Sequence, residues 1–182
     1  MNYLAEFDIQ LLRPIHHCRI ESLDNLLLWL SGSTYYIAAG IVLCLGVAAL
    51  LHNPQKLRHS FARVIMMLAS VTMVVLSLKY TFLRTRPFEA YSDIVNLSEA
   101  TSPSFPSGHT AVAFSIALGF MFSGLGKPWY LLMLAWATAV AYSRMALGAH
   151  FPSDVLASVA IALIATIIIC KPVKKPSRNM TR

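Results

Sequence analysis

Residues 62–82 read ARVIMMLASVTMVVLSLKYTF, and this stretch decides how the chain can fold. Its length comes close to the ~20 residues that a helix needs to span the hydrocarbon core of a bilayer. Because lipid offers no water to backbone N–H and C=O groups, such a segment must satisfy them internally. Residues 62–82 are therefore predicted to form a membrane-spanning α-helix.

Four further apolar runs have similar lengths, some needing a flanking turn to span: Tyr35–Leu51, His109–Leu125, Trp129–Met145 and Val155–Cys170. Hydrophobic residues make up 57% of the 182 residues and charged residues only 13%, against roughly 45–50% and 25% in soluble domains. A soluble protein of this size could not bury so much apolar surface. The sequence predicts an all-α integral membrane bundle of about five transmembrane helices, forming one domain over residues 1–182.

The N-terminal region, residues 1–33, differs from these runs because it carries charge throughout. Residues 3–20 and 23–30 are predicted to form one or two amphipathic helices on the membrane surface. The alternative is an additional tilted span over residues 4–30. The charges that make this alternative less favourable are Glu6, Asp8, Arg13, Arg19, Glu21 and Asp24.

The charges of the loops predict the orientation of the five spans. One side of the membrane holds nine basic and no acidic residues: Lys56, Arg58, Arg63, Lys127, Lys171, Lys174, Lys175, Arg178 and Arg182. Because cytoplasmic loops are enriched in Lys and Arg, this side is predicted to be cytoplasmic, including a loop at residues 52–61 and a basic tail at residues 171–182. The N-terminus, residues 83–108 and residues 146–154 then face the periplasm or the exterior of an inner or cell membrane.

The net charge of +7 does not indicate nucleic-acid binding. No basic stripe is interleaved with aromatic residues, and the long apolar runs leave little water-exposed surface for a groove. The charge instead follows the topology of the spans.

Three polar clusters fall on the predicted outward side, although they are far apart in the sequence. Residues 79–87, KYTFLRTRP, close the second span, and residues 106–109, PSGH, open the third. Residues 143–154, SRMALGAHFPSD, connect the fourth and fifth spans. Their common side predicts that they form one site.

The cations of these clusters suit a phosphate group. Lys79, Arg86 and Arg144 lie near the water boundary of their spans, where charged residues are usually functional. Arginine offers a planar fork to two oxygens, and lysine offers a compact charge. Ser107 and Gly108 lead into a helix start, whose free N–H groups favour anions, and Gly108 permits close approach of the backbone.

Two histidines supply the remaining chemistry. His150 and Asp154 are four residues apart, so both lie on one helix face if the fifth helix begins near His150. The carboxylate could then orient the imidazole as a nucleophile. His109 comes from another helix and could be the general acid for the leaving oxygen. Taken singly, each residue has a simpler interpretation, such as a topology anchor, an ion pair or a helix cap, and only the joint pattern favours a site.

The pattern Lys-x6-Arg-Pro, Pro-Ser-Gly-His and Ser-Arg-x5-His-x3-Asp resembles the three-part signature of the type 2 phosphatidic acid phosphatase superfamily. All the specified positions are filled with the right spacing within each motif, over residues 79–154. Residues 1–34 take no part in the resemblance.

The resemblance implies a metal-independent lipid phosphatase without a cofactor. His150 would attack phosphorus and form a phosphohistidine, Asp154 would support it, and His109 would protonate the leaving group. The phosphate oxygens would be held by Lys79, Arg86, Ser107, Gly108 and Arg144. No metal is implied, which fits the absence of a carboxylate cluster from the sequence.

Three functions remain open at this point. They are a lipid phosphatase, a lipid phosphotransferase on the same scaffold, and a non-catalytic protein that binds or transports anions. The two histidines and Asp154 favour catalysis, since binding alone needs only the cations. An outward-facing site suits undecaprenyl pyrophosphate first, with phosphatidylglycerol phosphate, phosphatidic acid and lipid A 1-phosphate as alternatives. The oligomeric state is left open.

Overall fold

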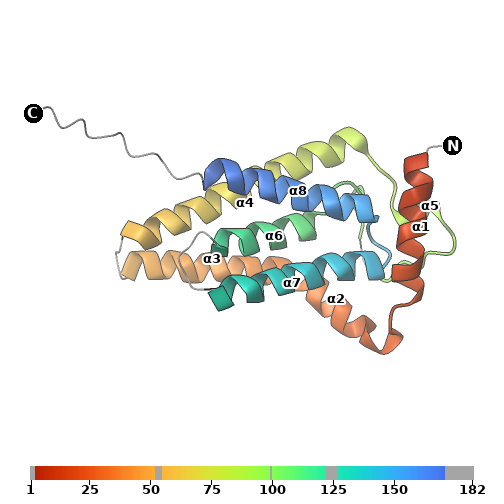
Figure 1. The fold of residues 1–182 in the computed structure, drawn as a ribbon, viewed down its shortest axis with the longest axis horizontal. Coiled ribbons are helices and arrows are strands. Elements are labelled where there is room, and N and C mark those ends of the chain that lie inside the picture. The colour runs from red at the N-terminus through yellow and green to blue at the C-terminus, as the bar shows by residue number, and fades with distance from the viewer. Residues whose placement is uncertain (1–2, 52–54, 99, 122–126, 171–182) are drawn as a thin grey trace, which may run out of the picture.

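The regular elements of the protein are helices throughout the part of the chain that the structure describes. The structure is a computed structural model that describes residues 3–51, 55–98, 100–121 and 127–170. The elements follow in the order α1 (Tyr3–His17), a 3-10 turn (Glu21–Leu23), α2 (Asp24–Gly32), α3 (Thr34–Leu51), α4 (Gln55–Phe82), α5 (Pro87–Ala90), α6 (Gly108–Met121), α7 (Lys127–Ala146) and α8 (Pro152–Ile169). Figure 1 shows α3, α4, α6, α7 and α8 running alongside one another, with α1 crossing one end of this bundle.

The core of the bundle is built around α6, which packs against α3, α4, α7 and α8. Buried residues occur all around this helix, as expected for an apolar helix surrounded by others. Many of them are small, including Ala111, Ala113 and Ala117, and small residues let helix backbones approach closely. A Cβ at Gly119 would lie 3.1 Å from Cε of Met67 on α4, so this contact has no room for a larger side chain.

The outer faces of the bundle expose large apolar side chains. On α3 they include Tyr36, Leu43 and Leu50, and on α8 they include Leu156 and Ile168. Contiguous apolar surface of this kind marks contact with another apolar phase, and a bilayer covers it without leaving backbone groups unsatisfied.

Three segments are long and apolar enough to cross a membrane, judged by length and composition: Thr34–Leu51, Leu57–Ala90 and Pro152–Ile169. Helix α6 is apolar but has only 14 residues. The all-α membrane fold is confirmed, whereas the count of five spans stays a prediction. Residues 122–125 and 171–182, which the sequence assigned to the end of a span and to a basic tail, lie outside the described residues.

One boundary in the prediction was wrong. Residues 52–61 were expected to form a loop before the second span, but α4 already begins at Gln55. Its first turns carry Gln55, Arg58 and His59, polar residues that tolerate a helical backbone. A helix can project beyond the hydrocarbon core into water, so polarity alone does not end it.

The N-terminal region folds as two separate helices, where the sequence predicted one or two. Helix α1 buries Asp8, Ile9 and Leu12 against the bundle, while Tyr3 and Leu4 are exposed. Helix α2 packs on α7. Their location on the membrane surface stays a prediction, as does the extent of a single domain over residues 1–182.

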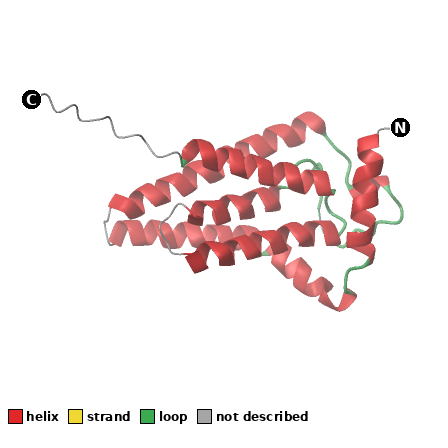
Figure 2. Ribbon diagram, in the orientation of Figure 1, coloured by secondary structure: helices red, strands yellow, loops and turns green. Residues whose placement is uncertain are grey.

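Most of the loops lie at the end of the bundle that α1 crosses, as Figure 2 shows. Helix α4 ends there with Leu83 at a φ of 45°, a left-handed conformation that is uncommon for a residue with a side chain. Such a residue after the last turn of a helix reverses the chain. This reversal directs the described residues that follow, 84–98 and 100–107, across this end of the bundle.

Candidate active site

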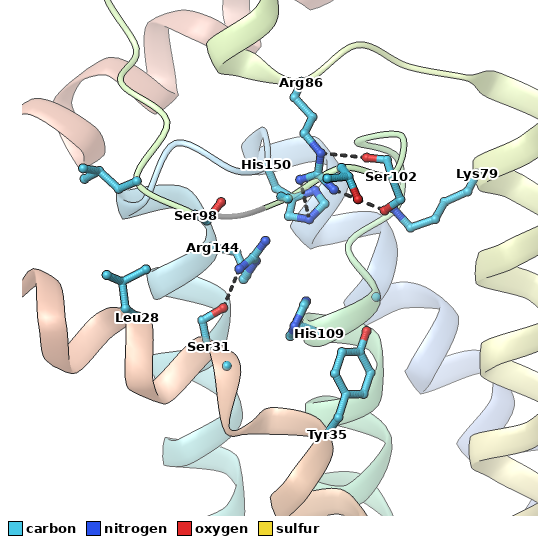
Figure 3. Close-up of a pocket in the computed structure, with 15 residues that line it drawn as sticks. Leu28, Ser31, Tyr35, Lys79, Arg86, Ser98, Ser102, His109, Arg144 and His150 are labelled. Atoms are coloured by element: carbon cyan, nitrogen blue, oxygen red, sulfur yellow. Dashed lines mark hydrogen bonds between the residues drawn. The ribbon is translucent and has the colours of Figure 1, made fainter.

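A cavity of about 500 Å³ opens at the looped end of the bundle. Residues from several helices and loops line it, and six of the eight predicted site residues are among them: Lys79, Arg86, Gly108, His109, Arg144 and His150. Figure 3 shows Arg86, Arg144, His109 and His150 around the same space. The three sequence clusters therefore meet in one cavity.

Arg86 is held rigidly at the edge of this cavity. It is 3% exposed, and its Nε donates to the carbonyl oxygen of Ser102 at 2.7 Å. One terminal nitrogen donates to the carbonyl oxygen of Ala149 at 2.8 Å and lies 3.5 Å from Nε2 of His150. The same guanidinium thus fixes two loops and points a positive charge at the imidazole.

Arg144 and Lys79 provide the other two cations. Both are buried, and Nζ of Lys79 donates to the carbonyl oxygen of Pro103. Arg144 donates to Oγ of Ser31 on α2, but its buried Nε has no hydrogen-bond partner in the described part of the chain. A buried, unpaired guanidinium N–H is costly, and it is the arrangement expected of a group that receives an anion.

His150 lies against Asp154 at the back of the cavity. Its Nδ1 is 3.6 Å from Oδ2 of Asp154 and 3.5 Å from Oγ of Ser104, which itself donates to that Oδ2 at 2.5 Å. Helix α8 begins at Pro152, near His150 as expected, and the imidazole sits in the preceding turn. The expected proximity of the two side chains holds, because Asp154 is in the first turn and reaches back.

The surroundings of His150 favour a neutral imidazole with its proton on Nδ1. The side chain is 2% exposed, and burial lowers the pKa of His150 to about 3, with the nearby charges of Arg144 and Arg86 contributing to this effect. Nδ1 faces acceptors, while Nε2 faces an N–H of Arg86. Nε2 therefore carries the lone pair that a nucleophile needs.

His109 approaches the cavity from the first turn of α6. Its ring packs on that of Tyr35 from α3, with 4.6 Å between centroids. Gly108 lies beside it, where a Cβ would come within 3.0 Å of the Tyr35 hydroxyl. The start of α6 is thus closely packed against α3, and its free N–H groups point toward the end of the bundle that holds the cations.

Ser107 is the predicted phosphate-binding residue whose hydroxyl does not line the cavity. Its Oγ is 2.9 Å from Oγ1 of Thr110 and caps the start of α6, and its N–H donates to the carbonyl oxygen of Asp154 at 3.3 Å. This contact joins α6 to α8 behind the site. A direct contact between Ser107 and phosphate stays a prediction.

The loop that carries His150 is packed backbone against backbone. Gly148 has a φ of 72°, and a Cβ there would lie 2.6 Å from the carbonyl oxygen of Val95. The buried His16 of α1 joins the same loops, since its Nε2 accepts from the N–H of Val95 at 3.1 Å and its Nδ1 lies 2.9 Å from the carbonyl oxygen of Ala146. The loop has little freedom to move the imidazole.

Three residues that contact Asp154 directly or through one partner were missed by the sequence analysis. Ser104 lies three residues before Ser107, and Arg84 lies inside the cluster 79–87, so a closer look at both motifs could have found them. Asp8 had a weaker signal, a carboxylate on the apolar face of an amphipathic helix. Its partner could not have been inferred without the tertiary structure.

An all-helical membrane bundle with three cations, two histidines and a buried carboxylate at one end defines a phosphate-processing membrane enzyme. The sequence profile of the PAP2 superfamily matches residues 60–177, which is more than half of the chain. The chain belongs to the PAP2 superfamily.

Individual proteins agree with this assignment. The chain is 29% identical to the undecaprenyl-diphosphatase BcrC of Bacillus subtilis over 149 residues, covering 82% of this chain and 73% of the relative. The crystal structure of Aquifex aeolicus LpxE superposes with a TM-score of 0.77 at 28% identity, covering 91% of this chain and 96% of that one.

A transmembrane PAP2-type phosphatidylglycerolphosphate phosphatase from Bacillus subtilis has the same fold. Its TM-score is 0.77 at 19% identity, over 93% of this chain and 85% of that one. The predicted family, the integral membrane location and the class of lipid phosphatase are confirmed.

Proposed function

We propose that this lipid phosphatase acts through a phosphohistidine at His150, and that undecaprenyl pyrophosphate is its substrate. The observation that carries the mechanism is the convergence of three cations and two imidazoles on one cavity, with a carboxylate directly behind one imidazole. The lone pair on Nε2 of His150 attacks phosphorus, and the bond from phosphorus to the leaving oxygen breaks. Nδ1 keeps its proton, and Asp154 stabilises the resulting positive charge.

His109 acts as the general acid and then as the general base. It gives a proton to the leaving oxygen in the first step and takes one from the attacking water in the second step, which releases inorganic phosphate. The non-bridging oxygens are bound by Lys79, Arg86 and Arg144, whose charges offset the negative charge of the transition state. The N–H groups at Gly108 and the hydroxyl of Ser107 complete the proposed phosphate site.

Two observations support the substrate and its side of the membrane. The chain is similar over most of its length to the undecaprenyl-diphosphatase BcrC, and the nine basic residues of the opposite side favour an outward-facing cavity with a cytoplasmic C-terminus. Such a cavity meets lipids whose head groups reach the periplasm or exterior. Phosphatidylglycerol phosphate, phosphatidic acid and lipid A 1-phosphate are the alternatives that the same cavity could accept.

The test is phosphate release by the purified protein in detergent, with a chelator present, from each of these four lipids. We expect the fastest release from undecaprenyl pyrophosphate, and no release from any lipid in the variant His150→Ala. His59→Ala is the matched control, because His59 is exposed in the first turns of α4, at the other end of the bundle. Release by His150→Ala at the wild-type rate would refute the mechanism, and a faster reaction with another lipid would replace the substrate.

The orientation has a separate test in sealed vesicles. A lipid confined to the outer leaflet of right-side-out vesicles should lose phosphate to the external medium. Phosphate that is released only in inverted vesicles would contradict an outward-facing site.

A further inference from the structure

Helix α1 contributes a buried carboxylate to a cluster that ends at Asp154. Asp8 is 5% exposed, and its Oδ2 accepts from a terminal nitrogen of Arg84 at 2.6 Å. The other terminal nitrogen of Arg84 donates to Oδ1 of Asp154 at 2.6 Å. One guanidinium therefore bridges a carboxylate of the N-terminal helix and the carboxylate behind His150.

Ser153 closes this cluster. Its N–H donates to Oδ1 of Asp8 at 2.9 Å, its hydroxyl donates to Oδ2 of Asp8, and it accepts from Arg84 at 2.7 Å. Asp8 thereby takes up a free N–H in the first turn of α8, the same turn that contains Asp154. Its position is fixed by α8 as well as by Arg84.

The orientation of Arg84 is set independently of the two carboxylates. Its guanidinium carbon lies 4.1 Å from the centroid of the Phe151 ring, a stacking geometry that holds the planar group in place. Leu83, in its left-handed conformation, directs the chain at this point. The Phe151 ring and the chain reversal at Leu83 therefore hold Arg84 toward Asp154, in addition to its contact with Asp8 on α1.

We propose that Asp8 and Arg84 are positioning residues that hold Asp154 in the orientation in which it supports His150, and this inference rests on the proposed function. Within the described part of the chain, the Asp154 carboxylate has three hydrogen-bond donors besides the imidazole: Arg84 on Oδ1, and Ser104 and the N–H of Phe151 on Oδ2. Removing Arg84 frees one oxygen and lets the carboxylate rotate away from Nδ1.

The experiment compares kcat and KM for phosphate release, with the most rapidly hydrolysed lipid, in the full-length wild type, Asp8→Asn, Arg84→Gln and the double variant. We expect each single change to lower kcat about ten- to hundredfold, the factor that a charge-assisted hydrogen bond is worth. KM should stay within about twofold, because neither residue lines the cavity. The double variant should equal Arg84→Gln, since the two residues act in series.

Asp93→Asn is the matched control. Asp93 accepts from Nε of Arg13 at 2.8 Å and so also attaches α1 to the loop that follows α5. Its side chain is 40% exposed, and neither of its partners, Arg13 and His17, contacts Asp154 or Arg84 through a hydrogen bond that the structure describes. If the ion pairs of α1 served only to attach the helix, Asp93→Asn would lower kcat as much as Asp8→Asn does. We expect it to match the wild type.

Ser153→Ala provides the gentler variant if Asp8→Asn does not fold. It removes a hydroxyl that contacts Asp8 and Arg84 but keeps both charges, and we expect kcat to fall several-fold with KM unchanged. A wild-type kcat in Asp8→Asn would overturn the inference. If Asp8→Asn does not fold, a wild-type kcat in Ser153→Ala would overturn it. Additive losses in the double variant, or an equal loss in Asp93→Asn, would do the same.

The outcome for His150→Ala in the same assay separates this inference from the proposed function. Inactive His150→Ala together with fully active Asp8→Asn overturns only the positioning role. Active His150→Ala, or a wild type that releases no phosphate, overturns the proposed function and the positioning role with it.

Discussion

Arg144 offers a test in which activity and stability should move in opposite directions. Its guanidinium is 4% exposed, forms no ion pair with an acidic residue in the described chain, and has an unpaired Nε. Arg86 lines the same cavity and carries the same charge. The substitution Arg144→Met keeps an unbranched chain that fills the space and removes the charge.

The loss of activity follows from the contacts that Arg144 would make with a phosphate. Two charge-assisted hydrogen bonds at about 1.5–3 kcal/mol each amount to about 3–6 kcal/mol. This corresponds to a fall in kcat/KM of roughly a hundredfold to ten-thousandfold. Arg144→Lys should recover only part of this, because an ammonium group lacks the planar fork.

The stability should not fall in the same variant. The lost hydrogen bond to Ser31 stabilises the fold by about 1 kcal/mol, whereas burying a charge without a counter-charge costs several kcal/mol. We expect the free energy of unfolding to rise by about 1 kcal/mol, and Tm in detergent to rise by about 2–4 °C. Phosphate release and a thermal unfolding scan on the same preparation measure both quantities.

Two results would refute this reasoning. An Arg144→Met protein with wild-type kcat/KM would show that the guanidinium does not bind phosphate. A Tm more than about 5 °C below that of the wild type would show that Arg144 is a structural residue whose positive charge the fold needs.

Three further predictions concern the imidazole, its carboxylate and the start of α6. Asp154→Asn should lower kcat about a thousandfold or more and leave KM nearly unchanged, and alkali-quenched samples, in which the P–N bond survives, should contain less phosphohistidine. A kcat within about threefold of wild type would contradict this. Burial lowers the pKa of His150 to about 3, so between about pH 6.5 and 3 the unfolded chain binds more protons than the folded one, and the stability falls as the pH drops. We expect the Tm to fall less steeply with decreasing pH in His150→Gln than in the wild type. Equal slopes in the two proteins would count against burial of a neutral imidazole. Gly108→Ala should lower kcat/KM about tenfold, because the new methyl group would lie 3.0 Å from the Tyr35 hydroxyl. Adding Tyr35→Phe to this variant should recover part of the loss. If it recovers nothing, contact with the Tyr35 hydroxyl is not the cause of the loss.

The sequence predicted the meeting of Lys79, His109 and His150 because a bilayer leaves few choices. Once the apolar runs must be helices, the side on which each polar cluster emerges follows from counting spans. The helical form of α1 and α2 could be predicted because both segments are amphipathic.

What the sequence could not provide depends on contacts between distant segments. The partnership of Asp8 and Arg84 joins residues 76 positions apart, and no local pattern encodes it. The contact of Ser107 with Thr110 is local, but it uses the hydroxyl that the motif had assigned to phosphate.

The tight seating of Gly148 against Val95 has a consequence for how the reaction would be timed. If His150 is the nucleophile, as proposed, it lies on a tightly packed segment, and the head group of the lipid must then align with a stationary imidazole. The search is then two-dimensional diffusion in the membrane followed by rotation of a head group, and neither depends on a slow rearrangement of the protein. Bilayer viscosity, rather than loop motion, would then govern the encounter, and a more fluid lipid mixture would speed capture while leaving the chemical step as it is.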